Sequence, residues 1–460
     1  MGHLDRYFKI PIILTILPHL FLSGCSTFSK DGGFNEVSSF VTDRLHQQPV
    51  WLRTDEERAQ HQQAVNAILC ETLSVDEAVR VAFINNPSLQ KSLTELGIAE
   101  AELVQAGRVR NPGISYTKLS PVSGEYDIER RILFDVMSLL TMPMRSAIEK
   151  QYFQQAKLQA AIDIMDIAAK TRKAYYSAVA AEQMVKYLEK VNQASQASAQ
   201  LALRMAEVGN WSRLQQAREQ AFYTETTLQL ADAKLVALQE REHLTRLMGL
   251  WGEQINYKLP ERLPDLPLSV VESHELEKQA LMSRLDVQAI RHEIESKCKA
   301  LGLTKATRFI DVFDLGYVRN SSDEEPHQTG YEISLEIPLF DWGDAKVAKA
   351  QQIYMQSVWH LREIAINARS EVREAYQVYR VHYDKAKFYR DDVVTLRKLI
   401  LDESLLRYNG MLISTFELLA DEREQIMSVN AYIETLRDFW LAETDLQTAL
   451  MVKSPHSAVD

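Results

Sequence analysis

A heptad pattern that occurs twice constrains this chain more than any other feature. Residues 144–208 contain no proline or glycine, and apolar or small residues recur there at alternating steps of four and three. This spacing is typical of the buried seam of long packed helices. The pattern returns 201 residues later, so we expect two copies of one long helical hairpin. The seam positions are Ala160, Ile164, Ile167, Thr171, Ala174, Ala178, Ala181, Val185 and Leu188, and then Leu361, Ala365, Ala368, Val372, Ala375, Tyr379, His382, Ala386 and Tyr389.

Each long helix is predicted to end at a tight turn, the first at Gly209-Asn210 and the second at Asn409-Gly410. At ~1.5 Å per residue, the first helix would be on the order of 100 Å long, which does not suit the core of a compact enzyme. We predict a first repeat over 73–255 with its hairpin at 144–250, a proline-rich linker at 256–267, a second repeat over 268–452 with its hairpin at 343–452, and a tail at 453–460.

The composition excludes some classes of protein. The net charge is -11, so a nucleic-acid partner, which needs a basic face, is not expected. We find no phosphate loop, no zinc-protease motif and no clustered metal ligands, and we therefore expect no enzyme activity, no cofactor and no metal site. Cys70 and Cys298 could pair in an oxidising compartment, but isolated buried thiols are the favoured interpretation.

The N-terminus has the pattern of a secretion signal that ends in a cysteine. Arg6 and Lys9 precede an apolar run that leads into Leu22-Ser23-Gly24-Cys25. This segment resembles the lipobox of bacterial lipoproteins, which implies a signal peptide over 1–24 and fatty-acylation of Cys25. Ser26 after the cysteine favours, by the same resemblance, sorting to the outer membrane. Residues 25–72 would then form a lipidated tether.

Two pairs of strands are predicted, at about 112–120 and 126–138 and again at about 309–318 and 331–339. In the second strand apolar residues alternate with charged ones, although Arg130 and Leu133 break the pattern. Strands of this length and alternation are typical of outer-membrane barrels, and past the first thirty residues no run of eighteen apolar residues would make a membrane helix. Acidic residues that would line the lumen are Asp127, Glu129, Asp135, Glu332 and Glu336.

Four strands cannot close a spanning barrel, since known examples begin at about eight. An open sheet edge in lipid would leave backbone groups unsatisfied at several kcal/mol each. We therefore expect several copies of the chain to contribute strands to one barrel.

Several short motifs together resemble the TolC family of outer-membrane efflux ducts over nearly the whole mature chain. They are Leu73-Ser74-Val75-Asp76-Glu77-Ala78, Asn85-Asn86-Pro87, the Arg-x-Ala-Tyr copies at 172–175 and 373–376, Leu247-Met248-Gly249, Ile337-Pro338-Leu339-Phe340-Asp341-Trp342-Gly343, Arg407-Tyr408-Asn409-Gly410 and Phe416-Glu417-Leu418-Leu419. The resemblance implies a mainly α fold with a small β part, a homotrimer that closes a barrel of twelve strands, and a helical periplasmic tunnel. It also implies that a periplasmic adaptor and an inner-membrane pump dock at Gly209, Asn210, Asn409 and Gly410.

The same resemblance places charged gating residues at the tips of the hairpins. An acidic position of the family falls on Glu417, a second lies near Asp421, and the residue that matches the family's acidic link is Arg213. We therefore predict that Arg213 and Glu417 form an ion pair that restrains a closed tip. The alternative is that these are solvated surface charges worth about 0–1 kcal/mol.

The favoured function is a passive exit duct for a tripartite efflux or type I secretion system, lipid-anchored in the outer membrane. The alternative is a coiled-coil lipoprotein that scaffolds the envelope and does not conduct. The cargo stays open, although acidic residues on a lumen face would favour cations.

Overall fold

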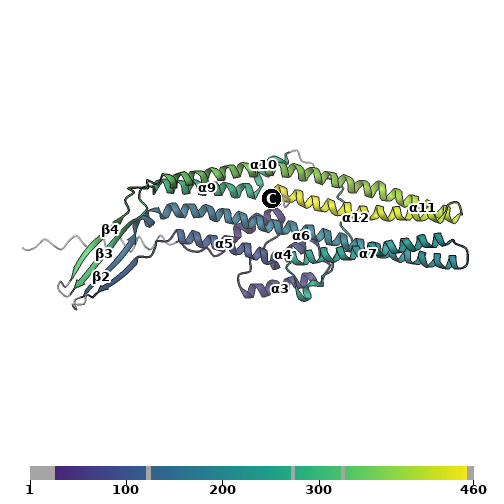
Figure 1. Ribbon diagram of the computed structural model, residues 1–460, viewed down its shortest axis with the longest axis horizontal. Coiled ribbons are helices and arrows are strands. Elements are labelled where there is room, and N and C mark those ends of the chain that lie inside the picture. The colour runs from purple at the N-terminus through teal and green to yellow at the C-terminus, as the bar shows by residue number, and fades with distance from the viewer. Residues whose placement is uncertain (1–25, 121–125, 271–274, 323–326, 453–460) are drawn as a thin grey trace, which may run out of the picture. The chain divides into compact units, whose positions relative to one another are not determined.

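The computed structural model describes residues 26–120, 126–270, 275–322 and 327–452 (Figure 1). The predicted signal peptide, the predicted lipidation site at Cys25 and the predicted tail lie outside these residues. The chain divides into two compact units. The first comprises residues 1–37, 94–160 and 286–364, and the second comprises 38–93, 161–285 and 365–460.

A four-stranded antiparallel sheet dominates the first unit, with the strands in the order β1-β2-β3-β4. The strands are β1 (Gly113–Leu119), β2 (Asp127–Asp135), β3 (Phe313–Ser322) and β4 (Gln328–Leu335). Both predicted pairs are present. They join through β2 and β3, where Ile132 lies opposite Tyr317.

The second strand pair is displaced from its predicted position along the sequence. β3 continues to Ser322 because its polar end still pairs with β2, where Asp127 lies opposite Ser322. β4 ends at Leu335 rather than at Leu339. Pro338 has no N–H to donate to a ladder, so the apolar run 337–340 leaves the sheet despite its strand-like composition.

The helices of both units account for most of the chain. The first long helix, α6 (Val136–Glu207), has 72 residues. The second is continuous from α10 (Asp344–Phe388) through one π-helical turn, η2 (Tyr389–Val393), into α11 (Val394–Asn409). The remaining helices are α2 (Phe34–Leu45), α3 (Asp55–Leu69), α4 (Val75–Asn85), α5 (Pro87–Ala106), α7 (Arg213–Leu247), η1 (Gly252–Ile255), α8 (Leu276–Ser283), α9 (Leu285–Ala306) and α12 (Thr415–Met451).

The predicted heptad seam is the buried stripe of both long helices. In α6, Ile164, Thr171 and Ala178 are fully buried, and in α10, Ala368 and Ala386 are too. Among the described residues, no helix combines the length and the apolar character that crossing a membrane requires.

The core of the second unit contains aromatic rings contributed by both copies of the repeat. Tyr176 of α6 stacks on Trp440 of α12 with ring centroids 5.3 Å apart, and Tyr379 of α10 packs on Phe439 at 5.5 Å. The Tyr175 hydroxyl donates a hydrogen bond of 2.8 Å to the carbonyl of Leu73. These contacts give Tyr175, Tyr176 and Tyr379 a role in packing the helices together.

The duplication extends to an ion pair. Arg172 contacts Asp76 at 3.4 Å, and the residues 201 positions later, Arg373 and Glu277, form the same pair at 3.3 Å. Cys70 and Cys298, in contrast, are both free and exposed. The expectation that they are buried is therefore wrong.

Candidate functional site

The two faces of the β-sheet differ in chemistry. Directly opposed residues of an antiparallel sheet point to the same side, so the strand register assigns every described strand residue to a face. One face, here called the polar face, carries Asp127, Glu129, Arg131, Asp135, Asp314 and Glu332 together with Ser115, Thr117, Asn320, Ser322, Gln328 and Ser334, and also the apolar Leu119, Leu133 and Val318. The other, here called the outward face, carries Ile114, Tyr116, Ile128, Ile132, Phe134, Phe313, Leu315, Tyr317, Tyr331, Ile333 and Leu335, together with Lys118, Arg130, Arg319, Ser321 and Thr329 toward the hairpin ends.

Arg131 holds two of the predicted lumen acids together on the polar face. It forms ion pairs with Glu129 on its own strand and with Glu332 of β4, the latter at 3.0 Å. All three side chains are about one-third exposed. Arg131 and Glu332 are 201 residues apart, so this pair joins equivalent positions of the two repeats.

The residue Leu133, which breaks the polar alternation, has a packing role. It lies opposite Gly316 of β3, and a side chain at Gly316 would come within 2.8 Å of Leu133. An apolar side chain therefore covers a glycine within a mainly polar face.

Large apolar side chains are exposed on the outward face. Ile114, Tyr331 and Ile333 have 80%, 90% and 69% of their surface exposed. Soluble proteins rarely expose a continuous apolar patch of this kind without a partner. Such a surface suits lipid or another apolar partner.

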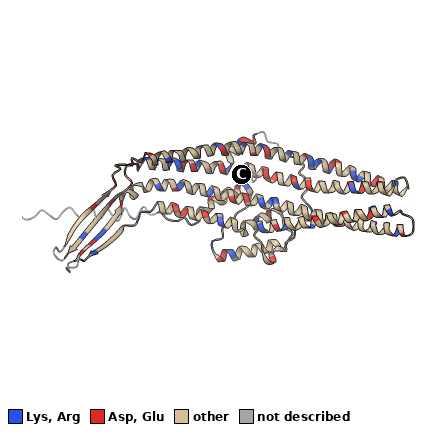
Figure 2. Cartoon of the chain, in the orientation of Figure 1, with Lys and Arg blue, Asp and Glu red and all other residues tan. Residues whose placement is uncertain are grey.

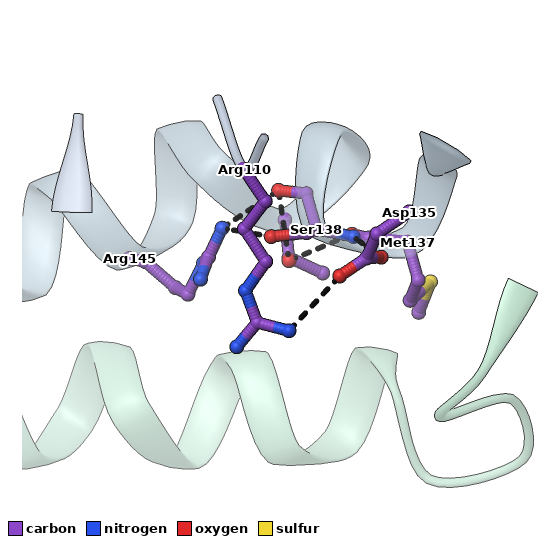
Figure 3. A network of polar contacts seen from close by, with 6 residues as sticks. Arg110, Asp135, Met137, Ser138 and Arg145 are labelled. Carbon is purple, nitrogen blue, oxygen red and sulfur yellow. Dashed lines mark hydrogen bonds and ion pairs between the residues drawn. The ribbon is translucent and has the colours of Figure 1, made fainter. Parts of the chain in front are cut away.

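Two of the predicted lumen residues have other roles. Asp135 is the last residue of β2, and its carboxylate accepts a hydrogen bond of 2.6 Å from the backbone N–H of Ser138 (Figure 3). This contact caps α6, which begins at Val136 rather than at Met144 and continues through Pro143. Arg110 pairs with the other carboxylate oxygen at 3.0 Å.

The junction between β2 and α6 is further fixed by Arg145. Its guanidinium donates to the Ser138 carbonyl at 2.8 Å and to the Ser138 hydroxyl at 2.6 Å (Figure 3). Glu336, the other exception, follows the end of β4 and is not a strand residue. Asp127, Glu129, Asp135 and Glu332 are therefore the predicted acids that the sheet places on the polar face, with Asp135 at the end of β2 where it also caps α6.

The turns at the tips of the two helical hairpins are built differently. Gly209 has φ of 78°, and the N–H of Asn210 donates to the Met205 carbonyl at 2.9 Å, which closes the end of α6. In the second turn Gly410 has a negative φ, and Met411 takes the left-handed conformation with φ of 61°. The motif Asn409-Gly410 therefore marks the turn, but its glycine does not supply the left-handed residue.

The charged residues predicted at the tips lie close to these turns. Ser414 and Glu417 form a capping box at the start of α12, in which the Glu417 carboxylate accepts from the Ser414 N–H at 2.8 Å. Asp421 accepts a hydrogen bond of 2.5 Å from the Ser404 hydroxyl of α11. Arg213 is the first residue of α7, and no ion pair between Arg213 and Glu417 occurs in the described part of this single chain.

A groove of about 710 Å³ lies between α7 and α12 near the tips. The Arg218 guanidinium lies 4.7 Å from the ring centroid of Phe416 across it. Glu219 is 1% exposed and accepts a hydrogen bond of 2.7 Å from Ser198. Burial raises the pKa of the Glu422 carboxyl, with a contribution from the charge of Glu219 and an opposing one from Arg423.

Apolar side chains at both turns are exposed. Met411 and Leu412 are 93% and 77% exposed at the second turn, and Val208 and Leu214 flank the first with 70% and 61%. Charged residues of both signs lie along the adjoining helices (Figure 2). The tips therefore offer apolar contact surface.

Comparison with known proteins identifies the fold. No protein-family model matches the sequence, and a search of curated proteins gives no match either. Solved structures do match. The CusC transmembrane channel aligns over 82% of this chain and 92% of its own with 18% identity and a TM-score of 0.68. The Campylobacter jejuni outer-membrane channel CmeC aligns over 90% and 91% with 15% identity and 0.65. The Vibrio cholerae outer-membrane protein VceC aligns over 82% and 95% with 14% identity and 0.68.

This chain has the TolC fold. The match covers most of each chain, so the long helices and the four-stranded sheet of this protein follow the fold of these channels. The resemblance to the TolC family is thus confirmed at the level of the fold, which is mainly α with a small β part.

Sequence reasoning overlooked part of the sheet of this TolC-type chain. Arg131 is one of the charged residues that alternate along β2, and this alternation does not indicate that it links Glu129 to Glu332. The 201-residue offset between Arg131 and Glu332 is a signal that could have revealed the pair. Arg130, which breaks the alternation, lies on the outward face opposite Arg319.

Proposed function

We propose that this chain is one subunit of an outer-membrane exit duct that passively conducts substrates out of the cell. The observation that carries the proposal is the two-faced sheet, mainly polar on one side and, in the rows nearest the helices, apolar and exposed on the other, in a chain with the TolC fold. In this account the polar face lines an aqueous lumen and the outward face contacts lipid.

The lengths of the strands suit this role. β2 has 9 residues and β3 has 10, which at ~3.3 Å per residue gives about 30 Å. At the ~40° tilt of barrel strands, this corresponds to a height of about 23 Å. The apolar band of outer-membrane barrels is ~25 Å tall, so the height of these two strands comes close to that of the band.

A single chain leaves two strand edges open, because β1 and β4 are the outer strands of the sheet. Unpaired backbone groups in lipid cost several kcal/mol each. We therefore propose a homotrimer in which β4 of one chain pairs with β1 of the next, so that four strands per chain close one barrel. The assembly of three chains, rather than two, follows from the resemblance to the TolC family.

The tips are proposed as the docking site for a periplasmic adaptor and an inner-membrane pump. The docking residues are Gly209, Asn210, Asn409 and Gly410, and exposed Met411 and Leu412 supply apolar contact beside them. The pump would determine most of the substrate selectivity. The acids Asp127, Glu129 and Glu332 on the polar face favour cations over anions as permeating ions.

Cys25 is proposed as the site of fatty-acylation. Several acyl chains hold a protein on a membrane far more firmly than one. With this anchor, the protein would be tethered to the outer membrane by lipid as well as by its strands.

Arg213, Glu417 and Asp421 are proposed to restrain the closed tip in the assembled duct. Within one chain Glu417 caps α12 and Asp421 contacts Ser404. Arg213 is therefore the residue to replace, because its replacement leaves both of these contacts in place. We expect the Arg213→Ala channel to leak more than the parent channel. The leak is measured in a planar bilayer, without adaptor protein, as the fraction of time that the channel is open. An equal open fraction would count against the restraint.

Single-channel conductance tests the duct proposal against the non-conducting scaffold. The purified full-length protein, shown by native mass spectrometry to be a folded oligomer, is added to a planar bilayer. A duct gives discrete conductance steps, at least in the Arg213→Ala variant. The absence of steps from both folded proteins would favour the scaffold.

A further inference from the structure

The outward face of the sheet changes in character from the helices toward the hairpin ends. The rows nearest the helices are apolar: Phe313 lies opposite Leu335, and Leu315 lies opposite both Phe134 and Ile333. The next row contains the neighbouring rings of Tyr317 and Tyr331, whose centroids are 6.1 Å apart. Apolar residues followed by aromatic ones are typical of a barrel surface approaching the membrane–water interface.

Cations occupy the two rows beyond the aromatic one. Arg130 of β2 lies directly opposite Arg319 of β3, and Lys118 of β1 lies one row further toward the hairpin end. All three residues are exposed. The described strand residues of this face include no aspartate or glutamate, whereas the polar face carries Asp127, Glu129, Asp135, Asp314 and Glu332. We refer to Lys118, Arg130 and Arg319 together as the cationic row, although they occupy two neighbouring rows of the sheet.

The opposition of Arg130 and Arg319 requires an explanation. Directly opposed strand residues have Cβ atoms about 4.5–5.5 Å apart, and like charges at this distance destabilise the pairing. Arg130 donates a weak hydrogen bond of 3.4 Å to the Ser321 hydroxyl, which does not neutralise its charge. An anion held between the two guanidinium groups would turn this repulsion into attraction, because guanidinium binds phosphate oxygens in a bidentate manner.

Aromatic rings support two of these cations. The Arg130 guanidinium lies 5.8 Å from the ring centroid of Tyr116, and the Lys118 ammonium lies 5.7 Å from that of Tyr126. Tyrosines and long cationic side chains together at the edge of an apolar surface are typical of the level of lipid headgroups.

We propose that the cationic row binds the phosphate groups of anionic lipid headgroups at the rim of the sheet distal to the helices. This inference rests on the proposed function, because it requires the outward face to lie in lipid. The partner is a lipid rather than a soluble anion because the row continues directly from the apolar and aromatic rows that would contact acyl chains.

Lipid preference in native mass spectrometry tests this proposal. The full-length protein in detergent is titrated with phosphatidylglycerol or with phosphatidylcholine, and bound lipids are counted. Each cation contributes about fivefold to binding of an anionic lipid, so the K118Q/R130Q/R319Q variant should lose on the order of a hundredfold in phosphatidylglycerol affinity. Phosphatidylcholine binding should change little.

The matched control removes the same charge from exposed lysines of the helices, as K91Q/K349Q/K398Q. This control should retain the preference for phosphatidylglycerol. Equal loss in both triple variants, or no loss in the first, would overturn the proposal. A further outcome would also overturn the proposal: excess inorganic phosphate releases the lipid, and the acyl chains make no difference to binding. That result would identify a site for free anions.

A second variant keeps the test decisive if the triple variant folds poorly. Arg319→Gln removes the like-charge opposition, so this variant should be at least as heat-stable as the parent without anionic lipid but gain less stability on adding phosphatidylglycerol. An equal gain in both proteins would contradict the proposal. Conductance of the same preparations separates this inference from the proposed function. Channels that form without a lipid preference refute only the lipid inference, whereas the absence of channels refutes the duct.

Discussion

Gly249 connects two of the short motifs that suggested the TolC family. It has φ of 65°, and a Cβ atom at this position would lie 2.4 Å from the backbone oxygen of Asn85. The Asn86 side chain donates a hydrogen bond of 2.7 Å to the Leu247 carbonyl beside it. The segments 85–87 and 247–249 therefore dock backbone against backbone, which only glycine permits.

Replacing Gly249 by alanine should destabilise the protein by about 2–4 kcal/mol, since it adds both left-handed strain and a clash with backbone. Denaturant unfolding measures the loss. Gly252 is the matched control: its φ is 61°, but a Cβ there would meet nothing within 4 Å. Gly252→Ala should cost about 1–2 kcal/mol. Equal costs at the two sites would contradict the close approach at Gly249.

Met411 presents the opposite case, a bulky residue in the left-handed region. The sequence pointed to Gly410 as the residue that turns the chain, and no propensity rule would select methionine for this conformation. Met411→Gly should stabilise the second turn by about 1 kcal/mol through relief of this strain. Hydrogen exchange of the amides at 408–414 measures the effect, which should appear as about fivefold slower exchange. Unchanged or faster exchange would argue against strain at Met411.

The helices and strands were predictable to different degrees. The heptad spacing predicted both long helices because burial of a continuous seam dictates that pattern, and Ile164 and Ala368 are indeed fully buried. The start of α6 was misplaced because alternation continues past Asp135, whose carboxylate caps the helix. The π-helical turn over 389–393 has no counterpart in α6 and no signature in the sequence.

The pairing of α7 with α12 near the tips predicts a pH dependence. The pKa of Glu422 is raised above its ordinary value of 4.5, first by burial and then by the charge of Glu219. The folded state therefore binds this proton more tightly than the unfolded state does, so stability decreases as the pH rises through the folded pKa and is not affected well below 4.5.

Glu422→Gln should accordingly raise the thermal unfolding temperature at a pH of about 8 and have little effect at a pH of about 4. Thermal unfolding of the parent and the variant over this range is the measurement. Glu424→Gln serves as a control, because that residue is exposed and forms an ion pair with Arg397 at 2.9 Å. If Glu422→Gln were less stable than the parent at high pH, the claim that burial raises the pKa of Glu422 would be refuted.

At the scale of the whole molecule, the sequence indicated the duplication and the polar face, since both follow from periodic patterns. Asp127, Glu129, Asp135 and Glu332 lie on the predicted face, although Asp135 also caps α6, while Glu336 follows the end of β4. The outward cations were overlooked, because the opposition of Arg130 to Arg319 depends on a register between strands almost 200 residues apart. Distant register of this kind cannot be obtained from local alternation.

The central claim is that one face of the sheet lines a conducting lumen. Adjacent residues of β4 test it directly, because Ser334 lies on the polar face and Ile333 on the outward face. Cysteine is introduced at either position in a channel whose exposed Cys70 and Cys298 have been replaced by serine. A charged, membrane-impermeant thiol reagent is then applied during single-channel recording. We predict that modification changes the conductance of the Ser334→Cys channel and leaves the Ile333→Cys channel unchanged. An effect at Ile333→Cys alone, or channels that never form, would contradict the account.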